Sequence, residues 1–165
     1  MTDRPRILTK IGAWVSQPVD TYPYYAMVQA QCDSSTGSTD QDQRWSDGGF
    51  FSQPNLPSGP YAEQLFKFGA NVCLWAPSAQ AGNGGGLFLV PCDANDRNQL
   101  WIAYVVPLVA PPVGSENSAI VFQNVGTGTC IDADGTYGGR AGDRVWQWSC
   151  KTDGSDPFQE WAIGP

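Results

Sequence analysis

The chain has 165 residues, of which 15% are charged, with 19 glycines, 13 prolines and a net charge of −7. This length suffices for one domain with a buried core, and seven tryptophans and seven phenylalanines argue against a disordered chain. Nine basic residues without clusters exclude a nucleic-acid backbone or an anionic membrane surface as the natural partner. Because there is no histidine, Ser-His-Asp and Cys-His catalysis and the commonest zinc ligand are missing. We therefore expect a non-catalytic protein without metal or cofactor.

Short apolar runs separated by Gly, Pro, Asn, Asp and Ser predict an all-β domain. No stretch approaches the apolar length of a membrane-spanning helix, and MTDRPRILTKIGAW lacks the apolar centre of a signal peptide. Either the protein acts where it is made or a leader has been removed.

The tripeptide Gln-x-Trp occurs three times along the chain, ending at Trp45, Trp101 and Trp161, at intervals of 56 and 60 residues. Each copy ends a similar segment, which predicts a threefold internal repeat. We place the repeats at about 5–47, 63–104 and 117–163 within a single domain, 1–165.

The first segment, ILTKIGAWVSQPVDTYPYYAMVQAQCDSSTGSTDQDQRW, keeps an apolar strand, the second cysteine (Cys32) and Gln-x-Trp. Its first cysteine is absent. One alignment places Ser16 there, and other gap placements put Trp14 or Val15 at that position.

The second and third segments each hold two cysteines, Cys73 with Cys92 and Cys130 with Cys150, separated by 19 and 20 residues. In both, an apolar strand precedes the first cysteine, a Gly-rich turn follows, and an alternating strand (LFLVPC or RVWQWSC) leads to the second.

The connectors SDGGFFSQPNLPSGPYAEQ and AYVVPLVAPPVGSENSA are rich in Pro, Gly and Ser and are predicted to be surface loops. They carry Phe50, Phe51 and Tyr61 and the apolar run VVPLVAPPV. These apolar residues either pack against their own domain or form a partner surface.

In this ordered set of motifs the chain resembles the ricin-type β-trefoil lectins, whose repeats carry Cys-(Ile/Leu)-Asp, a pair of cysteines and a terminal Gln-x-Trp. The resemblance covers about residues 5–163. It implies an all-β trefoil of three four-stranded repeats. Six strands would close a barrel and six would form a hairpin cap, with the Gln-x-Trp tryptophans meeting in the core.

Pairing within each repeat gives the simplest disulfides, Cys73–Cys92 and Cys130–Cys150, because the strands that flank one hairpin come close together. They imply an oxidising compartment, and hence secretion with the leader removed. Cys32 is the fifth cysteine and has no partner in this pairing. We expect it to be either a relic buried thiol or a bridge to another subunit.

In the third segment the resemblance implies a sugar site at Asp132, Trp148 and Lys151. Asp132 would accept from sugar hydroxyls, the Trp148 ring would stack on the sugar, and Lys151 would donate. Gln159 would hold Asp132 from behind. Phe158 stands where the family has an orienting amide, and would act as a second apolar wall.

The other two segments lack this set. The second keeps Asn98 and Gln99 but has Trp75 for the aspartate and Val90 for the aromatic. The first has Pro18 or a nearby Ser or Val, then Ala30 and Asp42, at the three positions that the family uses. We therefore expect one site in three.

Structural alternatives exist for the acidic and aromatic residues of the third segment. Asp132 and Asp134 are also suited to an Asx turn, and Trp148 to the core. For Asp153 and Asp156, solvated turn carboxylates are expected rather than glycosidase acids or calcium ligands.

The predicted function is a secreted, non-catalytic lectin for a glycan of a cell surface or polysaccharide, with galactose-type sugars among the candidates. An alternative is a protein-interaction or receptor-binding subunit, through the apolar loops or Cys32, similar to the trefoil binding subunits of cytolethal-distending-type AB toxins. A third possible function is that of a targeting module in a secreted glycosidase or protease. No nucleic acid and no membrane insertion are expected.

Overall fold

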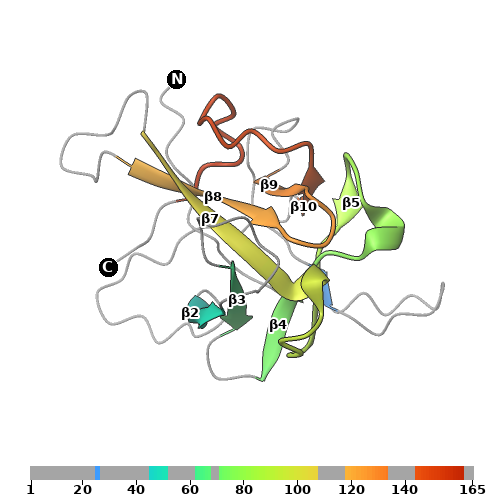
Figure 1. Cartoon of the computed structure of the whole chain (residues 1–165). Helices are drawn as coiled ribbons and strands as arrows, with labels where there is room; N and C mark the ends of the chain where they lie inside the picture. The colour runs from blue at the N-terminus through green and yellow to red at the C-terminus, as the bar shows by residue number, and fades with distance from the viewer. Residues whose placement is uncertain are drawn as a thin grey trace, which may run out of the picture.

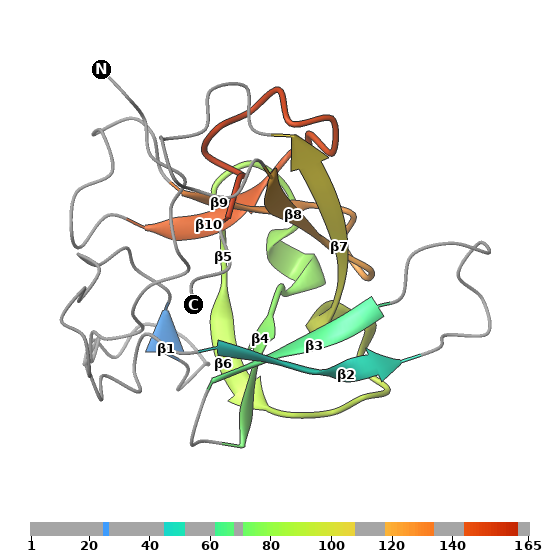
Figure 2. The same cartoon turned by 90° about the vertical axis from the view of Figure 1, so that its left-hand side faces the viewer.

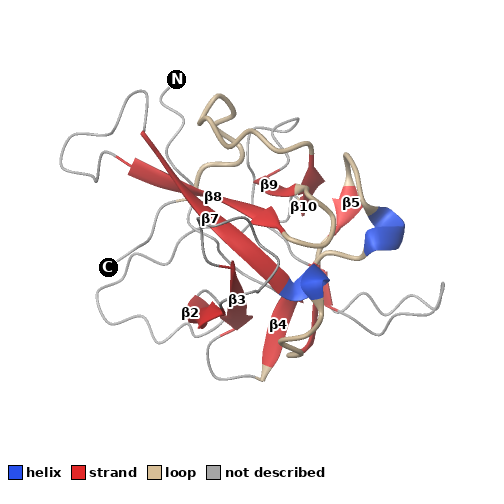
Figure 3. Cartoon of the chain, viewed as in Figure 1, coloured by secondary structure: helices blue, strands red, loops and turns tan. Residues whose placement is uncertain are grey.

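The protein is described from a computed structural model over residues 71–107, 118–133 and 144–161, and over the backbone of three earlier strands. This part of the chain holds ten strands and two short 3-10 turns (Figures 1 and 3). The strands are β1 (Tyr25–Ala26), β2 (Trp45–Phe51), β3 (Ala62–Lys67), β4 (Val72–Trp75), β5 (Gly85–Gly86), β6 (Phe88–Pro91), β7 (Leu100–Pro107), β8 (Ser118–Asn124), β9 (Cys130–Ala133) and β10 (Val145–Trp148). The 3-10 turns are η2 (Ser78–Gln80) and η3 (Arg97–Gln99).

All strand pairs are antiparallel, and their order is β1-β6-β4-β3-β7-β8-β9-β10-β5, with β2 on β3. β5 ends this path and β6 lies next to its opposite end, yet only Leu87 separates them along the chain. The sheet therefore curls round, so that the strand at one end of the path is joined through one residue to the strand next to the other end (Figure 2). Curling of this kind leaves fewer exposed edges than an open sheet.

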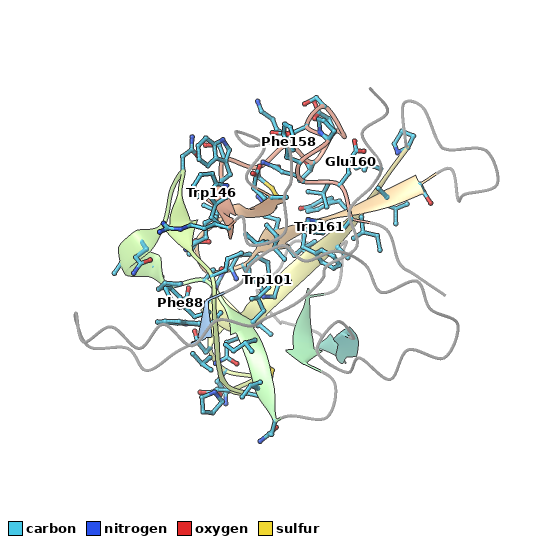
Figure 4. The ribbon with its side chains drawn as sticks, turned by 180° about the vertical axis from the view of Figure 1, so that it is seen from behind. Phe88, Trp101, Trp146, Phe158, Glu160 and Trp161 are labelled. Carbon is cyan, nitrogen blue, oxygen red and sulfur yellow. A yellow bond between two sulfur atoms is a disulfide. The ribbon has the colours of Figure 1, made fainter. Side chains whose placement is uncertain are left out.

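The core lies inside the curled sheet. Leu87 is 1% exposed, and the two described Gln-x-Trp tryptophans, Trp101 and Trp161, belong to the same buried cluster (Figure 4). Each indole N–H donates to a backbone carbonyl of a strand in its own segment, from Trp101 to Leu74 O of β4 at 3.1 Å and from Trp161 to Ile131 O of β9 at 3.2 Å. A buried indole N–H needs such an acceptor, so these bonds fix how each tryptophan lies.

The all-β prediction is confirmed over the described residues, but the prediction of two loop connectors was wrong in part. Strand β2 includes the first six residues of one connector, and β7 and β8 extend into the other. β7 and β8 pair without a break from Trp101 opposite Asn124 to Pro107 opposite Ser118. Aromatic and β-branched residues favour such pairing, and the Pro and Ser content concealed it.

Two neighbouring valines near the end of β7 lie in different environments, one packed against its own domain and the other exposed on the surface. Val106 is 2% exposed and packs with Ala119 and Val121, whereas its neighbour Val105 is 74% exposed. This is the alternation of an antiparallel strand with one face on the core. Pro107 is exposed, and residues 108–113, the rest of VVPLVAPPV, lie outside the described residues.

Both predicted disulfides are present, Cys73–Cys92 with Cα atoms 5.0 Å apart and Cys130–Cys150 with Cα atoms 4.7 Å apart. Cys73 lies in β4 and Cys92 directly after β6, and Cys130 lies in β9 and Cys150 shortly after β10, so each disulfide links two paired strands of one segment. Cys32 lies outside the described residues. No helix in the described part is long and apolar enough to cross a membrane.

Replacing Cys73 and Cys92 together by alanine should lower the free energy of unfolding by about 3 kcal/mol, because the unfolded chain gains the freedom of a loop of this size. Urea unfolding of the double variant beside wild type measures the loss. The single variant Cys92→Ala should lose at least as much, since it leaves a buried thiol. Equal midpoints for wild type and double variant would contradict the prediction.

Candidate functional site

Gln99 and Gln159, the glutamines of two Gln-x-Trp motifs, make hydrogen bonds to corresponding backbone atoms in their two segments. Gln99 Oε1 accepts from Asp93 N at 2.8 Å, and its Nε2 donates to Pro91 O at 3.1 Å. Gln159 Oε1 accepts from Lys151 N at 2.9 Å, and its Nε2 donates to Ser149 O at 3.0 Å. Asp93 and Lys151 each directly follow the second cysteine of their segment. The two amides thus hold the chain on either side of that cysteine.

Backbone hydrogen bonds also correspond between the second and third segments. Ala76 N donates to Asn98 O at 2.9 Å in one segment, and Ala133 N donates to Phe158 O at 2.9 Å in the other. Asn98 and Phe158 precede the glutamines, and Ala76 and Ala133 lie three residues after the first cysteine. The two segments can therefore be compared position by position.

Asp132 in β9 occupies the position where the two segments differ most. Its Oδ2 accepts from Gln159 Nε2 at 3.0 Å, and its Oδ1 accepts from Trp146 Nε1 at 3.1 Å. The side chain is 6% exposed. Two donors, one on each oxygen, hold the carboxylate in one orientation, and the predicted contact between Gln159 and Asp132 is present.

Trp146 and Trp148 stand on one face of β10 with their rings stacked, 5.3 Å between centroids and 27° between planes. Both are half-buried, whereas Val145 and Gln147 of the opposite face are buried. The alternative of Trp148 as a core residue is therefore wrong, because the core face of this strand is the other one. Strand pairing sets Trp146 opposite Asp132 and Trp148 opposite Cys130.

The remaining predicted residues lie at the C-terminal end of the same segment (Figure 4). Lys151 is exposed and follows Cys150, and its backbone N–H is the one that Gln159 accepts. Phe158 is half-buried, and its N–H donates to Asp156 Oδ1 at 3.1 Å. The structure brings Asp132, Gln159 and Trp146 into direct contact, with Trp148 stacked beside them.

The second segment has a different surface at these positions. Trp75 takes the place of Asp132 and pairs with Phe88, their ring centroids 6.3 Å apart. Val90, in the place of Trp148, is buried. Asn98 is engaged through its Oδ1 by Ser78 Oγ at 3.0 Å. The residues that the third segment offers, a carboxylate beside stacked indoles, are absent from this described segment.

The first-segment positions Pro18, Ala30 and Asp42, and also Asp134, lie outside the described residues. Asp153 and Asp156 each accept from the backbone N–H two residues on, at 3.0 and 3.1 Å. These are Asx turns, as expected for turn carboxylates. The Ser155 hydrogen bonds lower the pKa of Asp153. Among the described residues no group of three or more His, Cys, Asp or Glu side chains could hold a metal ion.

Two neighbours of the site were not identified from the sequence. Trp146 lies two residues before Trp148 on the same strand, and nothing in the sequence indicates that its indole donates to Asp132. Asn83 precedes β5, and its Oδ1 accepts from Ser149 N at 2.8 Å and from Ser149 Oγ at 2.7 Å. Asn83 lies 66 residues from Ser149 along the chain, so no local pattern indicates the contact.

Comparison with known proteins supports the fold alone. No protein-family profile and no curated protein matches the chain. A solved structure, the crystal structure of the designed 3-fold symmetric protein ThreeFoil, matches 84% of this chain and 79% of its own, with a TM-score of 0.58 and 16% identity. ThreeFoil is a β-trefoil, and the likeness supports a β-trefoil fold for this chain.

Glu160 lies next to Gln159 and is a buried carboxyl, 6% exposed. Burial raises its pKa, and the nearby Asp156 raises it further. The folded protein therefore binds this proton more tightly than the unfolded chain does. Stability from this group is fully present below the unfolded pKa and is lost as pH rises through the folded pKa.

Glu160→Gln should accordingly be more stable than wild type at neutral pH, because it buries no charge. The advantage should shrink as pH falls and Glu160 becomes protonated. Thermal unfolding of both proteins between pH 4 and 8 measures the difference. An advantage that is constant with pH, or that grows in acid, would contradict the burial argument, and Glu116→Gln outside the described residues serves as a charge-matched control.

Proposed function

We propose that this protein is a secreted, non-catalytic lectin of the ricin type, with one carbohydrate site in its third segment. Three four-stranded repeats in a β-trefoil are part of the proposal. Its support is the β-trefoil neighbour and the corresponding glutamine, tryptophan and backbone hydrogen bonds in the second and third segments.

The observation that carries the proposal is the arrangement around Asp132. A carboxylate oriented by two donors lies on the strand paired with β10, whose Trp148 ring is half-exposed. Sugar sites combine an oriented hydrogen-bonding group with an aromatic face for the C–H side of the ring. Of the second and third segments, which the structure allows to be compared, only the third has both the oriented carboxylate and the aromatic face.

Each residue has a distinct role in the proposed site. Trp148 stacks on the sugar, Asp132 accepts from its hydroxyls, and the Lys151 ammonium donates from the exposed edge. Phe158 adds an apolar wall, and Gln159 positions Asp132. Galactose-type sugars are one class of ligand that the family resemblance favours.

Secretion is proposed from the two disulfides, Cys73–Cys92 and Cys130–Cys150, which are consistent with an extracellular protein. Disulfides of this kind persist in oxidising compartments and are rare where thiols are kept reduced.

A glycan array should show binding by wild type and its weakening in Trp148→Ala and Asp132→Asn by at least about fivefold, since stacking and charge-assisted hydrogen bonds are each worth about 1 kcal/mol or more. Trp75→Phe, at the position in the second segment that matches Asp132, should bind like wild type. Circular dichroism confirms that each variant is folded.

A blank array from folded wild type would overturn the lectin proposal. Binding that survives Trp148→Ala and Asp132→Asn but is lost in Trp75→Phe would move the site to the second segment.

A protein-interaction subunit is the second candidate, favoured by the 74% exposure of Val105 on β7. A large exposed aliphatic side chain beside exposed Pro107 fits the apolar part of a partner surface. A catalytic subunit of a multi-subunit toxin is the partner that the family resemblance offers.

Val105→Lys should then abolish co-purification with a protein encoded beside this one and co-expressed with it, because the charge cannot be desolvated in the interface. Lys151→Ala, exposed but in the proposed sugar site, should leave the complex intact. A complex that tolerates Val105→Lys contradicts this candidate.

A further inference from the structure

We infer that Asn83, in the turn before β5, is a specificity-determining residue of the proposed carbohydrate site, its side-chain amide donating hydrogen bonds to a sugar oxygen. The inference rests on the proposed function and deepens it. The turn belongs to the second segment and the site to the third, so the site would be composite.

The orientation of the Asn83 amide is fixed by chemistry. Ser149 N is 2.8 Å from the side chain, and Ser149 Oγ is 2.7 Å from the same atom. A backbone N–H can only donate, so the atom that faces Ser149 is the carbonyl oxygen Oδ1. The amide nitrogen Nδ2 then carries two N–H donors, and no described residue accepts from them. Asn83 is exposed, so these donors are open to a ligand.

The same contacts place Asn83 beside the proposed site. Ser149 directly follows Trp148 in the chain. Its carbonyl oxygen and Asp132 Oδ2 both lie 3.0 Å from Gln159 Nε2. A continuous set of hydrogen bonds therefore runs from Asn83 through Ser149 and Gln159 to Asp132.

The turn is also held against the stacked indoles. Gly84 N donates to Gln147 O at 2.9 Å, and β5 pairs with β10 through Gly85 and Gly86. A Cβ added at Gly84 would lie 3.9 Å from Trp146 Cε3, so the turn passes close to that ring. Gly84 has φ +87°, a conformation that other residues rarely adopt. Figure 1 shows β5 next to β10, with the turn at its end.

The other residues of the proposed site offer a sugar no rigidly held hydrogen-bond donor on the side of Ser149. Asp132 only accepts when ionised, and Phe158 supplies no amide side chain. Lys151 donates, but through a long and flexible side chain without directional preference. A fixed amide bonded to Ser149, the residue after Trp148, would distinguish sugars by the position of one hydroxyl or ring oxygen, and a ligand without that oxygen would leave the donors unpaired.

The test compares Asn83→Asp, Ser149→Ala and Trp148→Ala with wild type on a printed glycan array, read at serial protein dilutions. Asn83→Asp keeps an oxygen for Ser149 N and Oγ but removes both N–H donors. Ser149→Ala removes one of the two bonds to Asn83 while the backbone bond keeps its orientation. Thermal unfolding shows whether the turn is still anchored.

Asn83→Asp is expected to unfold at the wild-type temperature and to bind about threefold to tenfold more weakly, by unequal factors for different glycans. Ser149→Ala should bind within about twofold of wild type. Wild-type binding that Trp148→Ala abolishes and Asn83→Asp leaves unchanged would overturn this inference alone. Equal weakening by Asn83→Asp and Ser149→Ala for every glycan would also overturn it, because anchoring of the turn would then be the cause. A blank wild-type array would overturn the proposed function together with it.

Discussion

A glutamine side chain buried to 0% exposure has to satisfy an acceptor and a donor inside the protein, and Gln159 does so with three partners. Those partners are Lys151 N, Ser149 O and the Asp132 carboxylate, which belong to the chain after β10 and to β9. Their relative positions are therefore set by one planar amide. The neighbouring Trp161 adds a second constraint from the same motif through Ile131 O.

The same framework supports two different surfaces. In the second segment, Gln99 and Trp101 make the corresponding bonds, yet Trp75 and Phe88 stand where the third segment has Asp132 and Trp146. Because the amide contacts are largely with backbone atoms, the framework tolerates an indole in place of a carboxylate. The framework is thus separable from the surface: the glutamines and tryptophans hold the same architecture in both segments, and the residues on β4, β6, β9 and β10 give each segment its own surface chemistry.

Sequence patterns predicted the parts of this structure that are local. The all-β class follows from composition, the two disulfides from the spacing of cysteines within one segment, and the contact between Gln159 and Asp132 from the family resemblance. Strands β2, β7 and β8 were missed where Pro, Gly and Ser accompany apolar residues, since composition does not show which strand pairs with which.

The donors around the candidate site were harder to identify. Trp146 can bond to Asp132 because strand register sets them opposite each other, and register is a property of the folded sheet. Asn83 reaches Ser149 only because β5 crosses to β10 from another segment. Neither contact has a signal in the spacing of residues along one chain segment.

Leu87 joins two strands that lie near opposite ends of the hydrogen-bonded path, and this has a kinetic consequence. The pairing of β5 with β10 connects residues about sixty positions apart, for instance Gln147 and Gly86, separated by 61. Contacts that close so large a loop form late, since chain entropy opposes them until the intervening strands are in place. Asn83 and Ser149 meet in this same closing step. A chain stalled before closure would therefore already be rich in strands while the second and third segments were not yet joined through this turn.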